Sequence, residues 1–318
     1  MASSTVMKAV DQFFPYLAPH LQIMNSTTAQ NTLYGAVDWS QTSWLERKWA
    51  AYYVWIANPL IATGLLSFVW HEIIYFGRAF PFWVMDQIPY FNQWKIQETK
   101  LPSHAEYMHC LKTVLAIHFL IELPLIFAFH PICEYFGMAT YEIPFSPVWK
   151  MAAQIAFFFV FEDTFHYWAH RWLHTPFMYK RVHKMHHKYQ VPFGLAAEYA
   201  HPIETLILSQ GTISGPFVYC LFAPKHSLHI LTVYVWIALR LAQAIDAHSG
   251  FDFPWSLRQF MPFWAGADYH DSHHAVFKGN YATSFRWWDQ MMGTDRWYKA
   301  QRASEAEKKL KAQQSKSQ

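Results

Sequence analysis

The residues best suited to chemistry in this chain are histidines, which fall into three groups at helical spacing. The first group is a pair four residues apart and the other two have the pattern HxxHH; the members are His166, His170, His183, His186, His187, His270, His273 and His274. Residues i, i+3 and i+4 share one helix face, so each group can direct its imidazoles at one point. Eight imidazoles exceed what one ion can bind, and the pattern predicts two metals. Imidazole suits zinc, copper, iron and nickel, so the ligands alone do not select the metal.

Three side chains beside the first pair are candidates for holding the ligands in place. Glu162 and Asp163 fall one turn before His166 and could accept imidazole N–H bonds, although Asp163 could instead be a helix-start charge. His174 lies one turn beyond the pair, but Thr175-Pro176 is expected to end the helix there. We therefore expect an outer or purely structural role for His174.

His248 is a candidate ninth ligand, because Asp246-Ala247-His248 closes an apolar run that leads to the same region. A histidine at a helix end can also serve the helix dipole without any metal. Coordination is favoured, since eight ligands shared by two ions leave one ion under-supplied. Asp246 is adjacent and could orient the ring.

Composition indicates a membrane protein. The 318 residues are 53% apolar, 19% aromatic and 15% charged, against about 25% charged in soluble domains. The net charge of +3 is too small to argue for nucleic acid. Three widely spaced cysteines imply no disulfide framework. We find no nucleotide-binding or serine-nucleophile motif, so any electrons must come from a separate protein.

Apolar runs of membrane length must position the histidines. We expect spans over 50–70, 113–133, 203–223 and 228–245, with a kink at Asn58-Pro59 in the first. The shorter run 151–161 should continue as a helix into the first histidine pair. Two crossings between the first two groups and the last return the chain to the same side, so the groups can meet.

His118 and Glu122 lie inside the second expected span. Ionisable residues within a membrane helix are functional candidates by default. A Glu122 that faces the bundle interior and is paired structurally is an equal alternative.

The basic residues around the first two groups predict that the metal-binding face is cytosolic; they are Arg171, Lys180, Arg181, Lys184 and Lys188. We expect the Trp- and Pro-rich stretch 251–299 to cap this face. The predicted fold is thus an all-α integral membrane helical bundle with a cytosolic-face, histidine-rich di-metal site and an aromatic helical cap. Its parts are a lead-in over 1–49, a catalytic domain over 50–299 and a basic, solvated, partly disordered tail over 300–318.

Several stretches resemble the membrane-bound fatty acid hydroxylase superfamily, and more closely its C-4 methylsterol oxidase branch. The superfamily signature is HxxxH, HxxHH, HxxHH. The branch resemblance is carried by EDTFHYWAHRWLH (162–174), HKMHH (183–187), PFGLAAEYAHPIET (192–205), DAHSG (246–250), FWAGADYHDSHH (263–274) and GNYATSFRWWD (279–289). The likeness covers about two thirds of the chain.

The resemblance implies a multi-pass endoplasmic reticulum enzyme with a non-haem di-iron centre. Such an enzyme uses O2 and electrons relayed from NAD(P)H through cytochrome b5 and its reductase. It oxidises a sterol 4α-methyl group to alcohol, aldehyde and carboxylate. Its pathway partners are a sterol 4-carboxylate decarboxylating dehydrogenase and a 3-ketoreductase.

Two other functions are compatible with the histidine pattern. The same core would serve a sterol C-5 desaturase or a fatty acid or sphingolipid hydroxylase. A metal transporter would be expected to spread its histidines through the spans, whereas here they cluster beyond the span ends.

Overall fold

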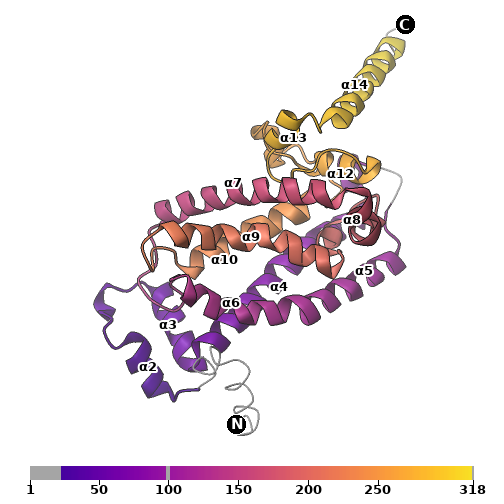
Figure 1. Ribbon diagram of the computed structural model, residues 1–318. Coiled ribbons are helices and arrows are strands. Elements are labelled where there is room, and N and C mark those ends of the chain that lie inside the picture. The colour runs from indigo at the N-terminus through magenta and orange to yellow at the C-terminus, as the bar shows by residue number, and fades with distance from the viewer. Residues whose placement is uncertain (1–22, 98–100, 317–318) are drawn as a thin grey trace. The chain divides into compact units, whose positions relative to one another are not determined.

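The computed structural model describes residues 23–97 and 101–316, in which the regular elements are helices, with irregular segments and isolated bridges between them but no strand. The α-helices (Figure 1) are α2 (Ser26–Tyr34), α3 (Trp44–Ile56), α4 (Pro59–Asp86), α5 (His104–Ile117), α6 (Leu123–Tyr135), α7 (Val148–Leu173), α8 (Pro176–Arg181), α9 (Pro202–Phe222), α10 (Ile230–Ala247), α11 (Leu257–Phe260), α12 (Ala267–Val276), α13 (Trp287–Met292) and α14 (Arg296–Lys316). A π segment, η4 (His118–Glu122), follows α5. The 3₁₀ segments are η2 (Trp39–Gln41), η3 (Pro89–Trp94), η5 (His183–Lys188) and η6 (Gly194–Glu198).

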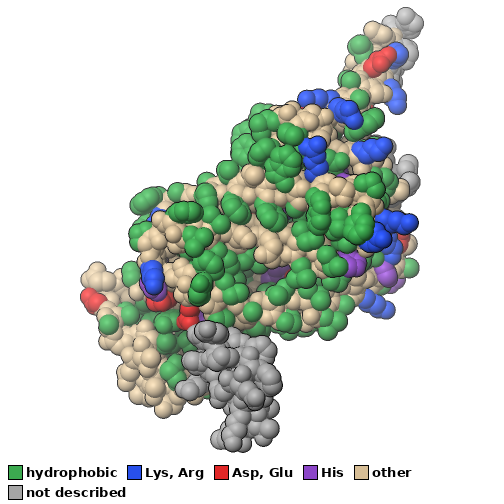
Figure 2. All heavy atoms as spheres, in the orientation of Figure 1, with side chains coloured by type: hydrophobic (Ala, Val, Ile, Leu, Met, Phe, Trp, Pro, Cys, Tyr) green, Lys and Arg blue, Asp and Glu red, His purple; other side chains and the backbone are tan. Residues whose placement is uncertain are grey.

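The described helices contain four candidate membrane spans by length and composition: Pro59–Asp86, His104–Tyr135, Pro202–Phe222 and Ile230–Ala247. The last two match the predicted runs closely, and the second extends the predicted 113–133. Large apolar side chains remain exposed on these helices, such as Leu120 and Phe222. Hydrophobic side chains cover much of the visible side of the long helices (Figure 2). Such a surface suits a lipid environment.

The first span begins later than predicted, because the run 50–70 is divided between two helices. Helix α3 ends at Ala57, whose φ of 56° is left-handed. Asn58 then accepts the Ile61 N–H at 2.9 Å with its side chain, as a helix N-cap does. Pro59 occupies the first helical position, where a missing N–H costs nothing. The expected kink is therefore a helix end followed by a new helix.

Two compact units make up the chain, and each has its own packing. Unit 1 comprises Met1–Ile73, Ile117–Phe158 and Ser214–Ala238; unit 2 comprises Ile74–Ala116, Phe159–Ile213 and Leu239–Gln318. In unit 1 the buried Trp49 ring packs edge-on against Phe145 at 5.6 Å and also contacts Tyr234. Glu46 of α3 accepts the Phe145 N–H at 2.8 Å, which ties α3 to the segment before α7.

Unit 2 has an aromatic core beneath its irregular segments. Phe193 packs against Tyr107 and Tyr189, and the rings of Phe251 and Phe253 stack at 5.3 Å. Lys95 lies 4.0 Å above the Phe251 ring. The start of the stretch predicted as a cap is therefore part of the core of unit 2.

Helix α7 runs without interruption through the short apolar run 151–161 into the first histidines, as predicted. Asp163 on this helix accepts the backbone N–H groups of Ser284 and Phe285 at 3.0 and 2.9 Å. Asp289 likewise accepts from Tyr281 and Ala282. Asp163 thus holds the loop after α12 against α7, and Asp289 holds the same loop against α13. Beyond that loop, the tail predicted as partly disordered is the helix α14 through Lys316.

Candidate metal centre

Nine histidines of unit 2 form two neighbouring groups, in each of which the potential ligand nitrogens lie within 4.8 Å of one another. The first group is His170, His174, His183, His187 and His273. The second is His186, His248, His270 and His274. The contributing segments are the end of α7, η5, the residue after α10, and α12 (Figure 1).

The Nε2 atoms of the first group converge. His183 Nε2 lies 3.1 Å from that of His170 and 3.0 Å from those of His174 and His187. His273 Nε2 lies 3.1 Å from His174 Nε2 and 3.2 Å from His187 Nε2. Five imidazoles thus face one point.

The second group repeats this arrangement with four rings. His270 Nε2 is 3.0 Å from His248 Nε2 and 3.1 Å from His274 Nε2. His186 Nε2 is 3.3 Å from His248 Nε2. His187 of the first group and His274 of the second have ring centroids 4.7 Å apart. The two groups are therefore adjacent.

In six of the nine rings the outward Nδ1 faces a hydrogen-bond acceptor, whereas Nδ1 of His187 and of His270 is buried without one. Nδ1 of His170 lies 2.8 Å from the Tyr281 carbonyl, and Nδ1 of His273 lies 2.6 Å from that of Gly279. The remaining pairs are His186 with the Tyr199 carbonyl, His248 with that of Ala244, His274 with that of Tyr189, and His183 with the Glu204 carboxylate. A carbonyl or carboxylate only accepts, so the ring hydrogen must sit on Nδ1. In these six rings, when neutral, the inward Nε2 then carries a lone pair.

His170 and His183 face each other with their Nε2 lone pairs at 3.1 Å, as do His186 and His248 at 3.3 Å, so neither contact is a hydrogen bond. Two nitrogens bound about 2.1 Å from one ion, at angles between 90° and 110°, lie about 3.0–3.4 Å apart. The observed spacing therefore fits rings arranged around a cation. Nitrogen donors held from behind by acceptors are also the usual environment of metal-ligating histidine.

Burial keeps these rings in the neutral form that binds metal. It lowers the pKa of His186 to about 4 and that of His248 to about 3. The pKa values of His170, His183, His187, His270, His273 and His274 are lowered well below their ordinary value, also chiefly by burial. At neutral pH protons do not compete for Nε2.

The structure places His174 and His166 the other way round from the sequence prediction, which took His166 as a ligand and His174 as an outer residue. His174 follows α7, but its N–H still bonds the His170 carbonyl at 3.1 Å, which carries its ring into the first group. His166 belongs to neither group. Its Nδ1 lies 3.3 Å from Glu162. The sequence HYWAHRWLH offers two equal i, i+4 pairs, and Thr175-Pro176 ends the helix too late to exclude the second.

Of the three carboxylates expected to hold imidazoles, Glu162 contacts His166 as expected, whereas Asp163 and Asp246 have other partners. Glu162 pairs with Arg240 Nε at 2.7 Å as well as with His166. Although burial alone would raise the pKa of Glu162, Arg240 and His166 lower it to about 2. Asp163 holds the loop after α12, as described above. Asp246 pairs with Arg78 at 2.7 Å instead of with His248.

The carboxylate that does contact a clustered histidine is Glu204, which sequence analysis did not single out. Its Oε1 lies 2.8 Å from His183 Nδ1, and both side chains are buried. An acidic residue in the first turn of an apolar helix, directly after the EYAHP stretch, was the available signal. The HxxHH at 183–187 is a 3₁₀ segment and not the α-helix expected from its spacing.

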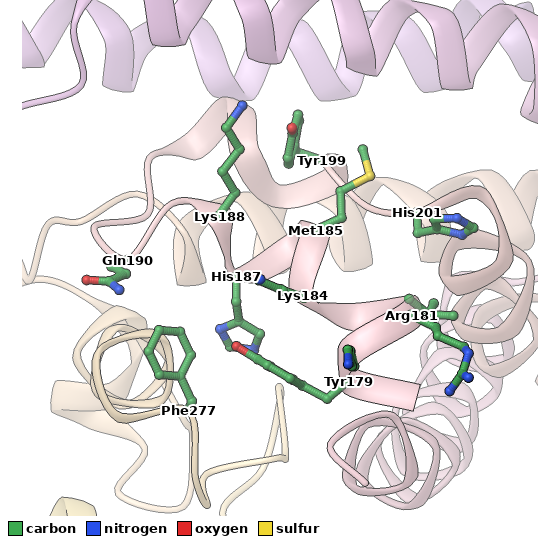
Figure 3. A pocket seen from close by; sticks show the side chains of 12 residues that line it. Tyr179, Arg181, Lys184, Met185, His187, Lys188, Gln190, Tyr199, His201 and Phe277 are labelled. Atoms are coloured by element: carbon green, nitrogen blue, oxygen red, sulfur yellow. The ribbon is translucent and has the colours of Figure 1, made fainter. Parts of the chain in front are cut away.

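A pocket of about 550 Å³ opens beside the first group and reaches His187. Figure 3 shows the His187 ring near Tyr179 and Phe277, whose rings lie 5.8 and 5.1 Å from it. Four exposed cations line the pocket: Lys180, Arg181, Lys184 and Lys188. Lys and Arg side chains gather over the region of α8 in the space-filling view (Figure 2). The residues described thus form two groups of histidines that could each hold a metal ion, beside a basic surface.

Comparison with known proteins agrees with a metal-dependent membrane oxidase. Residues 155–294 match the fatty acid hydroxylase family. The C-4 methylsterol oxidase erg25 of Schizosaccharomyces pombe is 50% identical over 87% of this chain and 91% of its own length. The methylsterol monooxygenase erg25B of Aspergillus fumigatus is 55% identical over 79% of this chain and 84% of its own length. Methylsterol monooxygenase 2-2 of Arabidopsis thaliana is 41% identical over 73% of this chain and 85% of its own length. No solved structure matches.

The chain therefore belongs to the fatty acid hydroxylase family, in its methylsterol monooxygenase branch, and is an oxidoreductase.

Replacing Glu204 should weaken metal binding at the first group, because Glu204 orients His183. We expect Glu204→Gln to lower metal affinity ~10-fold and Glu204→Ala up to ~100-fold, measured by competition with a chelator on the purified protein. Asp246→Asn is the matched control, since Asp246 pairs with Arg78. Equal losses in the Glu204 and Asp246 variants would contradict this assignment.

Proposed function

We propose that this protein is a C-4 methylsterol monooxygenase that oxidises the 4α-methyl group of a sterol with O2, using two iron ions. The observation that supports it most is the convergence of nine imidazoles, eight of them buried, in two adjacent groups, in a chain whose relatives are named methylsterol oxidases. The proposed reaction comprises three oxidations, through alcohol and aldehyde to the carboxylate.

The chemistry of the substrate favours iron over zinc at these sites. A methyl C–H has no acidity, so acid–base groups alone cannot break it. Iron bound by the two groups would supply O2 activation, whereas zinc has no redox chemistry. The residues of this chain supply neutral nitrogen donors, orient them through Nδ1, and exclude water by burial.

We assign one iron ion to each of the two histidine groups. One iron would be held by His170, His174, His183, His187 and His273, and the other by His186, His248, His270 and His274. In this assignment His248 completes the second site and His174 replaces His166 in the first. Glu162, Arg240 and His166 then form a buried ion-pair group beside the first site.

Electrons would reach the site from cytochrome b5, which takes them from NAD(P)H through its reductase. The four exposed cations of the pocket beside His187 are suited to a partner with an acidic face. The same cations support a cytosolic orientation by the positive-inside rule.

We place the enzyme in the endoplasmic reticulum membrane, where its sterol substrate would enter from the bilayer. The four candidate spans support membrane embedding. Its carboxylate product would pass to a sterol 4-carboxylate decarboxylating dehydrogenase, followed by a 3-ketoreductase.

Cells that lack this protein should accumulate 4,4-dimethyl sterols, because demethylation at C-4 stops at its first step. Sterol extraction and mass spectrometry measure this, and re-expression of the chain should restore the profile. A His187→Ala chain should not restore it. Accumulation of a sterol unsaturated at the wrong ring position, or loss of hydroxylated sphingolipids instead, would contradict the proposal.

The ligand assignment predicts opposite behaviour of two neighbouring histidines. His174→Gln should reduce iron retention by more than the ~10–100-fold typical of losing an outer partner, with a matching loss of sterol oxidation. His166→Gln should keep two irons per chain. Metal analysis of the two purified variants decides between them, and iron loss in the His166 variant alone would refute the assignment.

Reversing charge at the pocket should weaken use of the electron donor. We expect Lys184→Glu with Lys188→Glu to raise the KM for reduced cytochrome b5 several-fold at low salt, and the difference to shrink as salt screens the charges. Lys308→Glu on α14 is the control, since it reverses an exposed charge away from the pocket residues. An unchanged KM in the double variant would exclude the pocket as the docking surface.

A further inference from the structure

Unit 1 contains a second kind of histidine group, in the middle of two candidate membrane spans. His71 and Glu72 lie on α4, and His118 and Glu122 are the first and last residues of η4. His118 is fully buried, and the side chains of His71, Glu72 and Glu122 are 11%, 19% and 14% exposed. Ionisable groups at this depth are costly and are kept for function.

Glu72 orients both rings of this group. Its Oε1 lies 2.8 Å from His118 Nδ1 and 3.2 Å from His71 Nδ1. A carboxylate only accepts, so both ring hydrogens are directed at Glu72, and each neutral ring keeps its lone pair on Nε2. Histidines of the candidate metal centre in unit 2, such as His170 and His183, also have an acceptor behind Nδ1.

The Glu122 carboxylate faces the Nε2 side of the His71 ring. His71 Nε2 lies 3.5 Å from Glu122 Oε2, and the ring centroids of His71 and His118 are 4.9 Å apart. The potential ligand atoms of His71, His118 and Glu122 all lie within 4.8 Å of one another. A lone pair that faces a carboxylate oxygen needs either a proton or a metal ion between them.

The backbone at this point departs from the α-helix. The Leu123 N–H bonds the His118 carbonyl five residues earlier, which is the π-helical pattern. Short π segments within α-helices are frequent at functional sites. Pro124 contributes to the distortion, because its ring cannot fit a regular turn. The segment places His118 and Glu122 together beside His71.

We propose that His71, His118 and Glu122 form a third metal site, mononuclear and separate from the two histidine groups of unit 2, with Glu72 as the orienting carboxylate. Two imidazoles and one carboxylate bind Zn²⁺ and Fe²⁺ and leave positions open for further ligands. The bound divalent ion links α4 to η4 and neutralises carboxylate charge within the span. The proposal is independent of the reaction catalysed at the other groups.

The test counts metal ions in the full-length protein, purified in detergent, stripped with a chelator and reloaded with Zn²⁺. Wild-type protein should bind one more ion per chain than a His118→Gln/Glu122→Gln variant, whatever number the unit 2 groups hold. Glu72→Gln should lower the affinity of this extra ion ~10–100-fold. The ions retained at the unit 2 groups report that each variant is folded.

His130→Gln is the matched control. His130 is another fully buried histidine of the same span, but it bonds Thr63 at 2.9 Å and lies outside the group. This variant should bind as many ions as wild type. Equal Zn²⁺ counts in wild type and the His118→Gln/Glu122→Gln variant would overturn the proposal and assign a proton, shared between His71 and Glu122, to the group.

Discussion

The orientation of neutral imidazoles is the constraint on which the metal centre depends. Each neutral ring has one donor and one acceptor nitrogen. In unit 2 the donors face fixed oxygens, such as the Tyr281 carbonyl for His170, so the acceptors face inward. Where both rings of a pair have such an acceptor oxygen, as in His170–His183 and His186–His248, the inward nitrogens lie 3.1 and 3.3 Å apart and cannot bond one another. Because burial also lowers the pKa of these histidines, their inward nitrogens are better suited to a metal ion than to a proton.

Much of unit 2 serves to hold the oxygens behind the rings. Four of them are backbone carbonyls in irregular segments, at Tyr189, Tyr199, Gly279 and Tyr281. Irregular backbone lacks the regular hydrogen bonds of a helix, so side chains must hold it in place. Asp163 and Asp289 bond the loop over 279–285. The rings of Tyr189, Phe193 and Tyr199 pack together below the other two carbonyls. The aromatic content therefore has a structural role within the protein as well as a place at a membrane interface.

Ionisable residues within the candidate spans contact one another, whereas those at the pocket surface are exposed. Within the spans, His71, His118, Glu72 and Glu122 lie within contact of one another, as low polarity requires of ionisable groups. At the pocket beside His187, four cations are exposed and have no such need. The first arrangement suits an ion held in place, and the second suits a protein partner that binds and leaves.

The sequence by itself determined the fold class, the approximate spans and the presence of histidine groups that could hold two metal ions, because hydropathy and HxxHH spacing are local properties. It could also identify the family, since the residues around the histidines are as distinctive as the histidines. Tertiary structure decided which histidines converge. His166 and His174 have the same spacing to His170, and only the packing of α7 against η5 and α12 brings His174 into the group. The partners of Asp163, Asp246 and Glu204 could not be predicted from the sequence either, because a carboxylate bonds whichever donor the fold places beside it. Sequence neighbours such as Asp246 and His248 point to different partners once the helix ends between them.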